Sequence, residues 1–250
     1  TTCILCNKEN FKEILLQILD QVKTTESLDI HTWENSVYKP TPTIIEAAQA
    51  LYKGHSVKEI SRSDAGTINL SNTSHLINKI IEDSKIQHKK SICFLTGVPG
   101  AGKTLAGLNI ANERLKADES EHSVFLSGNG PLVDVLREAL TRDSVESAKK
   151  RGQKISRTEA ERKAKAFIQN IHHFRDDNLR TYNAPIEKVV VFDEAQRAWQ
   201  KEQVSKFMQQ KKGIPNFDMS EPEYLISVMN RHDDWCTIIC LIGGGQEINT

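Results

Sequence analysis

The most restrictive stretch of this sequence is Gly97-Val98-Pro99-Gly100-Ala101-Gly102-Lys103-Thr104, which has the pattern G-x-x-x-x-G-K-[ST]. It follows an apolar run at 92–95 and precedes a helical pattern at 105–115. In that context the glycines let backbone N–H groups face an anion, and the helix N-terminus adds its positive dipole end. We therefore expect all eight residues to bind a nucleoside triphosphate. Lys103 is expected to reach the β- and γ-phosphates, and the Thr104 hydroxyl to bind Mg²⁺.

The run Val189-Val190-Val191-Phe192-Asp193-Glu194 predicts the second half of the same site. A β-branched run that ends in two carboxylates is typical of a buried parallel strand with acids at its C-terminal edge, where ligands bind in open α/β sheets. Asp193 is expected to hold Mg²⁺ through water, and Glu194 to orient and deprotonate the attacking water. The alternative is an ordinary strand followed by an acidic helix start.

About 90 residues separate Lys103 from Asp193, which leaves room for at least one further strand between the two phosphate-site strands. This spacing, with a base directly after Asp193, favours an NTP-hydrolysing machine over a small-molecule kinase, which needs a substrate hydroxyl and a lid. A last apolar strand at 235–242 precedes three glycines and Gln246, whose amide is expected to sense the γ-phosphate. The alternative there is a flexible chain end. The sequence assigns no arginine finger.

Composition limits the class of protein. The 250 residues, 38% of them hydrophobic, suffice for one large α/β domain with appendages or for two small domains. Lys and Arg (33) balance Asp and Glu (33), so nucleic-acid binding has to be local. No apolar run is long enough for a membrane span or a signal peptide, so we expect no membrane partner.

The cysteines indicate a reducing compartment, and we expect a cytoplasmic protein. Cys93, Cys236 and Cys240 lie in predicted strands, where free thiols act as small hydrophobes. Cys3-x-x-Cys6 is half a zinc site without a matching second pair. Because the chain lacks an initiator Met and ends at Thr250 just after a glycine-rich motif, we expect a fragment of a longer protein.

The first third of the chain predicts an α-helical arm over 1–88, followed by an α/β domain over 89–250. Apolar spacing predicts helices at 10–23, 43–53 and 73–87, with a polar loop at 24–41 and Ser71 or Asn72 as the cap of the third helix. Packing against the core is the favoured role of this arm, and gripping a substrate or contacting the adenine is the alternative.

The middle of the chain predicts short strands at 123–126 and 167–171 with helices after them. The turn 127–131 either contacts ligand or only connects strand to helix. The charged segment 141–166 is typical of a solvated helix or a mobile loop, and its functional alternative is a contact with nucleic-acid phosphates. A polar network is favoured over metal for His172-His173. Helices are expected from Gln196 to about Lys212 and from Pro222.

Three segments carry a family resemblance: GVPGAGKTLAGLNIA, VVVFDEAQRAW and LIGGGQEIN. They resemble the helicase-like P-loop ATPases of a bacterial domain-of-unknown-function family, which is related to the helicase domain of Schlafen proteins and, more distantly, to superfamily 1 helicases. The resemblance covers about residues 30–250. Residues 97–104, 193–196 and Gln246 match helicase motifs I, II and III. Residues 127–131 take the place of motif Ia, and 171–174 are similar to a Thr-x-His-x-Phe element without its Thr.

The resemblance implies a three-layer α/β sandwich with a mostly parallel, RecA-like sheet. It also implies the first motor domain of a nucleic-acid-dependent ATPase that uses ATP and Mg²⁺, with Lys103, Glu194 and Gln246 as catalytic residues. Expected partners are single-stranded DNA or RNA and a second RecA-like domain or subunit that supplies an arginine, because motifs IV to VI are missing here. The neutral net charge motivates an alternative, a non-translocating nucleotide-gated switch in a defence or stress system, and a phosphotransferase is a third, minor option.

Overall fold

The computed structural model describes residues 7–21, 29–34, 42–55, 60, 64–117 and 121–243. The chain divides into two compact units, 1–40 and 41–250. Cys3, Cys6 and Gln246, and the predictions made for them, lie outside the described residues. No helix of the described part has the length and apolar character needed to cross a membrane.

The described residues of the first unit, 7–21 and 29–34, form two helices, α1 (Phe11–Gln21) and α2 (Ile30–Glu34). The predicted helix at 10–23 is therefore present, whereas the loop predicted for 24–41 is wrong where α2 forms. The carboxylate of Asp29 accepts a hydrogen bond from the backbone N–H of His31 at 3.1 Å, and an Asp in that position starts a helix by satisfying a free N–H group.

The second unit is built on a five-stranded sheet in the order β1-β5-β4-β2-β3, with every strand pair parallel. The strands are β1 (Lys90–Gly97), β2 (His122–Ser127), β3 (Ile168–Asn170), β4 (Glu187–Asp193) and β5 (Cys236–Gly243). The five strands predicted from apolar runs are confirmed. Because all run the same way, the ends of β1, β4 and β5 meet at one edge of the sheet, with β5 between the other two.

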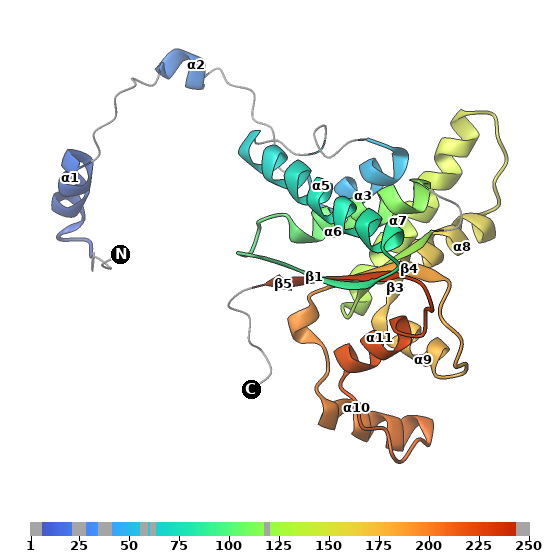
Figure 1. Ribbon diagram of the computed structural model, residues 1–250. Helices are drawn as coiled ribbons and strands as arrows, with labels where there is room; N and C mark the ends of the chain where they lie inside the picture. Colours follow the sequence, from blue (N-terminus) through green and yellow to red (C-terminus); the bar gives the residue numbers. More distant parts are fainter. Residues whose placement is uncertain are drawn as a thin grey trace. The chain divides into compact units, whose positions relative to one another are not determined.

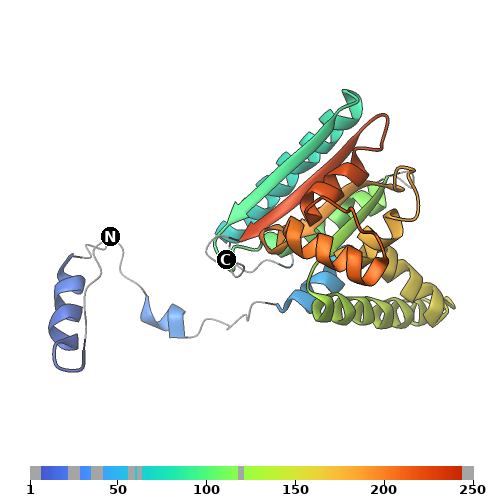
Figure 2. The same cartoon turned by 90° about the horizontal axis from the view of Figure 1, so that it is seen from below.

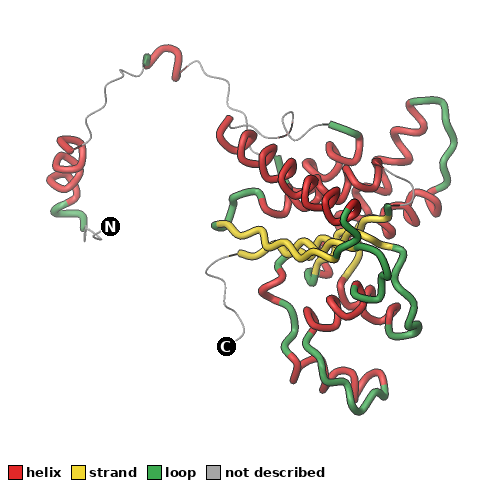
Figure 3. The backbone as a smooth tube through the Cα atoms, in the orientation of Figure 1, coloured by secondary structure: helices red, strands yellow, loops and turns green. Residues whose placement is uncertain are grey.

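Helices cover both faces of this sheet (Figures 1 and 3). One face packs on α3 (Ile44–Lys53), α5 (Asp64–Ile86), α6 (Lys103–Ala117), α7 (Gly130–Lys150) and α8 (Arg157–Phe167). The other face packs on α9 (Ile171–Asn178) and α11 (Glu221–Met229). Successive residues of the buried strands point to opposite faces of the sheet. Val191 packs in the hydrophobic cluster with α3 and α5 to α8, and Val190 packs in the cluster with α9 and α11. The predicted three-layer, RecA-like α/β fold is confirmed.

Helices α3 and α5 belong to the compact unit of the sheet, in which Leu51 and Ile81 are fully buried (Figure 2). The division between units thus falls at 40/41, whereas the sequence placed it at 88/89. The structure also corrects the cap predicted at Ser71 or Asn72, because α5 begins at Asp64 and both residues lie exposed inside it. The buried positions of α5 continue at helical spacing toward its N-terminus as far as Leu70. Packing therefore extends the helix beyond Ser71 and Asn72 in that direction.

Helix α6 approaches the sheet closely at Gly107. A Cβ atom there would lie 2.6 Å from Cδ1 of Leu241 and 2.9 Å from Cγ1 of Val191, distances that real side chains do not adopt. A glycine inside a helix costs about 1 kcal/mol relative to Ala, and here it allows α6 to lie against the strand that ends in Asp193. The close approach fixes the helix that begins with Lys103 against the acidic strand.

The helix predicted from Gln196 to Lys212 is wrong in its first half. Ala195–Arg197 form a short 3₁₀ turn (η1), and the chain is extended at Ala198 before α10 (Lys201–Phe207) and a π-helical turn, η2 (Met208–Lys212). Glu194 has φ 53°, in the left-handed region, so a right-handed helix cannot run on from β4. The predicted helix at Pro222 is confirmed as α11, with the proline in its first turn.

Candidate nucleotide-binding site

The glycine-rich loop joins β1 to α6. Gly100 and Gly102 have φ of 79° and 83°, values that favour glycine, and the backbone N–H of Ala101 donates to the carbonyl of Val98 at 3.2 Å. The Lys103 ammonium folds back onto this loop, where it donates to the carbonyl oxygens of Gly97 at 2.6 Å and Val98 at 3.0 Å. The loop is therefore a turn with two glycines in the left-handed region, and its lysine is held by loop carbonyls.

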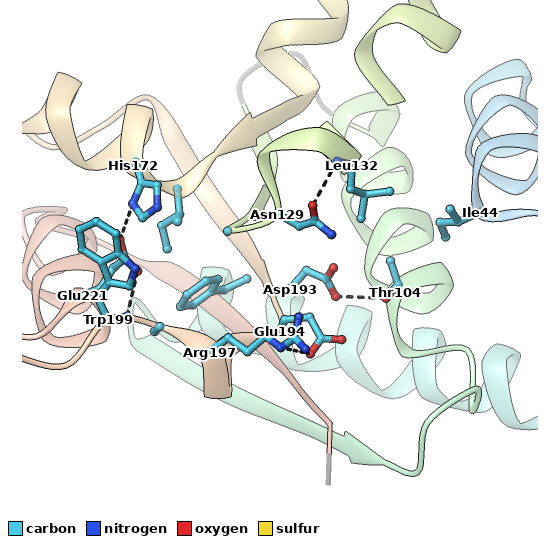
Figure 4. A pocket seen from close by; sticks show the side chains of 14 residues that line it. Ile44, Thr104, Asn129, Leu132, His172, Asp193, Glu194, Arg197, Trp199 and Glu221 are labelled. Atoms are coloured by element: carbon cyan, nitrogen blue, oxygen red, sulfur yellow. Dashed lines mark hydrogen bonds and ion pairs between the residues drawn. The ribbon is translucent and has the colours of Figure 1, made fainter. Parts of the chain in front are cut away.

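Thr104 and Asp193 meet across the sheet edge, from the first turn of α6 and the last residue of β4. The Thr104 hydroxyl donates to Oδ1 of Asp193 at 3.1 Å (Figure 4). These residues are 89 positions apart in the chain. The geometry places a hydroxyl and a carboxylate oxygen together, the donor set that Mg²⁺ prefers.

Burial makes Asp193 an unusual carboxylate. The residue is 3% exposed, and no Lys, Arg or His of the described residues forms an ion pair with it. Desolvation raises the pKa of Asp193 to about 6; the Thr104 hydrogen bond lowers it, and the neighbouring Glu194 charge raises it. A buried charge without a cationic partner is costly, so the site is suited to a cation from outside the chain.

We expect Asp193→Asn to stabilise the ligand-free protein at pH 7.5 by about 1–3 kcal/mol, since a pKa raised above the unfolded value means that ionisation opposes folding. The protonated Asp193 carboxyl carries no such penalty below about pH 4, and the parent protein loses stability as the pH rises from there through about 6. The difference in unfolding free energy between Asp193→Asn and the parent should therefore vanish on acidification toward pH 4. Urea denaturation with a chelator measures it. Asp177→Asn, at an exposed carboxylate, is the control, with a change below about 0.5 kcal/mol. Equal or lower stability of Asp193→Asn at pH 7.5 would contradict the penalty.

Glu194 is held by Gln196, which the sequence placed at the start of a helix. The Gln196 amide nitrogen donates to Oε2 of Glu194 at 2.5 Å, and its amide oxygen accepts from the backbone N–H of Gly243 at 3.1 Å. Arg197 Nε also lies 3.8 Å from the same carboxylate oxygen. One glutamine thus connects the acid after β4 to the last residue of β5.

A cavity of about 560 Å³ opens at this edge (Figure 4). Of loop residues 97–104, Thr104 is the one that lines it, together with Asp193 and Glu194. Asn129 lines it too, and its side-chain oxygen accepts from the Leu132 N–H at 3.3 Å to cap α7. The turn 127–131 therefore both connects strand to helix and borders the cavity.

The far side of the cavity is a polar and aromatic network around His172. Nδ1 of His172 lies 2.9 Å from Oε1 of Glu221, and its ring centroid lies 4.6 Å from that of Trp199. The other oxygen of Glu221 accepts from the Trp199 backbone N–H at 3.2 Å. Arg175 is 2% exposed and its guanidinium lies 4.8 Å from the Phe207 ring centroid, near Glu221. The polar-network role favoured for His172 agrees with these contacts.

The structure brings Thr104, Asp193 and Glu194 into one cavity, while Lys103 stays on the loop carbonyls. Trp199 and Glu221 were not predicted as cavity residues. The box Ser220-x-x-Glu223 locates the start of α11, where the Ser220 side chain accepts from the Glu223 N–H. Nothing in that local pattern indicates that the intervening Glu221 is buried against His172.

Known proteins resemble this chain to different degrees. A search of curated proteins finds no match. Among solved structures, a chain of Drosophila ORC bound to DNA is similar with a TM-score of 0.30 and 12% identity, covering 94% of this chain and 51% of that one. This chain thus corresponds to about half the length of that structure. The narrower resemblance to a bacterial ATPase family stays a prediction. The family described as "Schlafen group 3, DNA/RNA helicase domain" matches residues 90–250, and the chain belongs to this family.

Proposed function

We propose that this chain binds and hydrolyses ATP as the first motor domain of a helicase-like, nucleic-acid-dependent ATPase. The observation that carries the proposal is the meeting of Thr104 and Asp193 at 3.1 Å, with Glu194 beside them in one cavity. Membership of a DNA/RNA helicase domain family supports the same class of activity. The motor assignment also needs a second RecA-like domain or subunit with an arginine, and single-stranded DNA or RNA as partner.

The residues present fit a nucleotide with Mg²⁺. Residues 97–104 would hold the phosphates, with backbone N–H groups at the loop and the Lys103 ammonium at the β- and γ-phosphates. Thr104 and Asp193 would hold Mg²⁺, and the buried Asp193 carboxylate has no cationic partner among the described residues. When bound, Mg²⁺ neutralises phosphate charge and so eases attack at the γ-phosphorus.

Glu194 is the proposed general base. Its carboxylate orients a water molecule for in-line attack on the γ-phosphate and takes the proton as the new P–O bond forms and the bond to the ADP oxygen breaks. The Gln196 amide, at 2.5 Å, and Arg197 Nε, at 3.8 Å, both hold the Glu194 carboxylate, whose side chain is 36% exposed. Gln246, which lies outside the described residues, is proposed to sense the γ-phosphate beyond the end of β5.

The decisive measurement is ATP turnover with and without single-stranded DNA or RNA, on the protein in its longest available form. Stimulation by either polymer is the expected result. Lack of stimulation by both would overturn the motor assignment. Tight ATP binding with negligible turnover and nucleotide-dependent assembly would instead identify the chain as a nucleotide-gated switch.

We expect Gln196→Ala to lower kcat about tenfold while leaving the Kd for ATP within about threefold, because the base loses its fixed orientation but every phosphate-binding group remains. Steady-state turnover and ATP titration separate the two effects. Gln196→Glu is the matched variant, since it keeps an acceptor for the Gly243 N–H but repels Glu194. It should lower kcat at least as much as Ala does. Normal turnover in both variants would show that Gln196 does not position the base.

A further inference from the structure

The charged segment singled out in the sequence forms a helical hairpin, α7 and α8, which pack along one another. Helix α7 has 21 residues, about 31 Å at 1.5 Å per residue, whereas β2 has 6 residues, about 20 Å. Since α7 starts near the C-terminal end of β2 and runs back along it, its far end passes the start of the strand. In Figure 1 the turn between α7 and α8 lies on the opposite side of this unit from the glycine loop.

The end of α7 and the turn that follows it carry four exposed cations, named here the basic tip: Lys149, Lys150, Arg151 and Lys154. In the described part of the chain no carboxylate forms an ion pair with any of them, and the Arg151 guanidinium donates to the Ser147 carbonyl at 3.3 Å. Four of the other six cations of the hairpin contact a carboxylate: Arg142 and Arg157 both contact Glu138, Lys163 contacts Glu159, and Lys165 contacts Glu161. Among the described residues, Arg137 and Arg162 form no ion pair. Unpaired positive charge is therefore concentrated at the tip.

Stabilisation of helix α7 explains only two of the four cations of the basic tip. Lys149 and Lys150 lie in the last turn of α7, where cations stabilise a helix by about 0.3–1 kcal/mol through its dipole. Arg151 and Lys154 lie at and beyond the end of the helix, so that stabilisation does not explain both. They line a cleft instead.

The cleft beside the tip, of about 710 Å³, is rich in hydrogen-bond donors. Its two acids are each neutralised from within the cleft, Asp143 by Lys53 at 2.6 Å and Glu159 by Lys163 at 3.0 Å. Arg151 and Lys154 remain in excess, and the polar side chains of Ser147 and Gln153 border them. A surplus of cations with neutral donors beside them is the chemistry that binds phosphate oxygens.

We propose that the basic tip binds the phosphate backbone of a nucleic acid, as a second contact remote from the nucleotide cavity. The choice of a polynucleotide over another polyanion rests on the proposed function. The tip itself contains no aromatic residue, and Tyr52, which lines the cleft beside it, packs against Phe167 with 5.9 Å between the ring centroids. We therefore expect a contact with phosphates that is independent of base sequence.

The test is fluorescence anisotropy of a labelled 30-nucleotide single strand, as DNA and as RNA, titrated without nucleotide at about 50 to about 200 mM NaCl. The test variant replaces the tip with neutral residues of similar length, Lys149→Gln, Lys150→Gln, Arg151→Gln and Lys154→Gln. The control removes the same charge from paired exposed cations: Arg142→Gln, Lys165→Gln, Arg180→Gln and Lys201→Gln. Circular dichroism verifies that both variants fold.

The tip variant is expected to bind at least about tenfold more weakly at about 100 mM NaCl. The slope of log K against log NaCl concentration should become shallower by about 0.7 for each phosphate that the tip no longer neutralises, or by nearly three for the whole tip. The control variant should keep the slope of the parent protein. An unchanged slope and affinity in the tip variant would overturn the proposal. The proposal would also be overturned if polyglutamate competed as well as an unlabelled oligonucleotide of equal charge. The tip would then bind acidic proteins as readily as nucleic acid. Because no nucleotide is present, failure of ATP hydrolysis would not affect this outcome.

Discussion

Glu194→Gln should lower ATP turnover by about 10²- to 10⁴-fold while leaving the Kd for ATP within a few-fold. The substitution removes the proton acceptor but retains an oxygen that accepts the hydrogen bond from the Gln196 amide, 2.5 Å away in the native protein. The orientation of the side chain is thus kept, and the change isolates the charge. Single-turnover hydrolysis of labelled ATP, with equilibrium titration alongside, separates chemistry from binding.

The matched control for Glu194→Gln is Glu202→Gln, an exposed carboxylate in the first turn of α10. It carries the same chemical change within the segment that follows β4 and should leave both turnover and affinity unaltered. Turnover retained in Glu194→Gln would assign activation of the water to another residue. Loss of ATP affinity in step with turnover would instead place Glu194 in nucleotide binding.

The inner strands β2, β4 and β5 were predictable because they are mostly buried on both faces. Such strands are apolar without alternation, so runs such as 189–192 and 235–242 stand out from the charged helices around them. A glycine loop after one strand and two acids after another then predict which edge carries the site. The length of α5 was less predictable, because its polar residues Ser71 and Asn72 face solvent while packing at Leu70 continues the helix.

The meeting of Thr104 and Asp193 was predictable from the sequence, whereas the other interactions that join distant segments of the candidate site were not. Thr104 and Asp193 each belong to a local pattern, and parallel strand order brings them together. The bridge from Glu194 through Gln196 to Gly243 depends on the left-handed backbone of Glu194, which no residue type required. A glutamate in that conformation is uncommon, and helical spacing alone predicted a continuous helix instead.

The position of Lys103 bears on how a triphosphate is bound. Its ammonium donates to the carbonyls of Gly97 and Val98, so it occupies the loop that the phosphates would enter. Triphosphate binding would exchange these two neutral acceptors for charged phosphate oxygens, and hydrogen bonds to charged groups are worth about 1.5–3 kcal/mol each. Under the proposed function, the lysine would contribute to affinity through the difference between these two sets of hydrogen bonds.

Lys103→Ala should weaken ATP binding by about 10²-fold, in line with the loss of one or two charge-assisted hydrogen bonds. Isothermal titration with ATP and Mg²⁺ measures the effect. Lys89→Ala is the control, because Lys89 is an exposed lysine just before β1 that contacts Gln87 and lies at the opposite end of that strand. Unfolding free energy should change by less than about 1 kcal/mol in Lys103→Ala, since carbonyls left in an open loop can bind water. Undiminished ATP affinity in a folded Lys103→Ala protein would refute the phosphate-cradle assignment, and the motor proposal would lose its substrate.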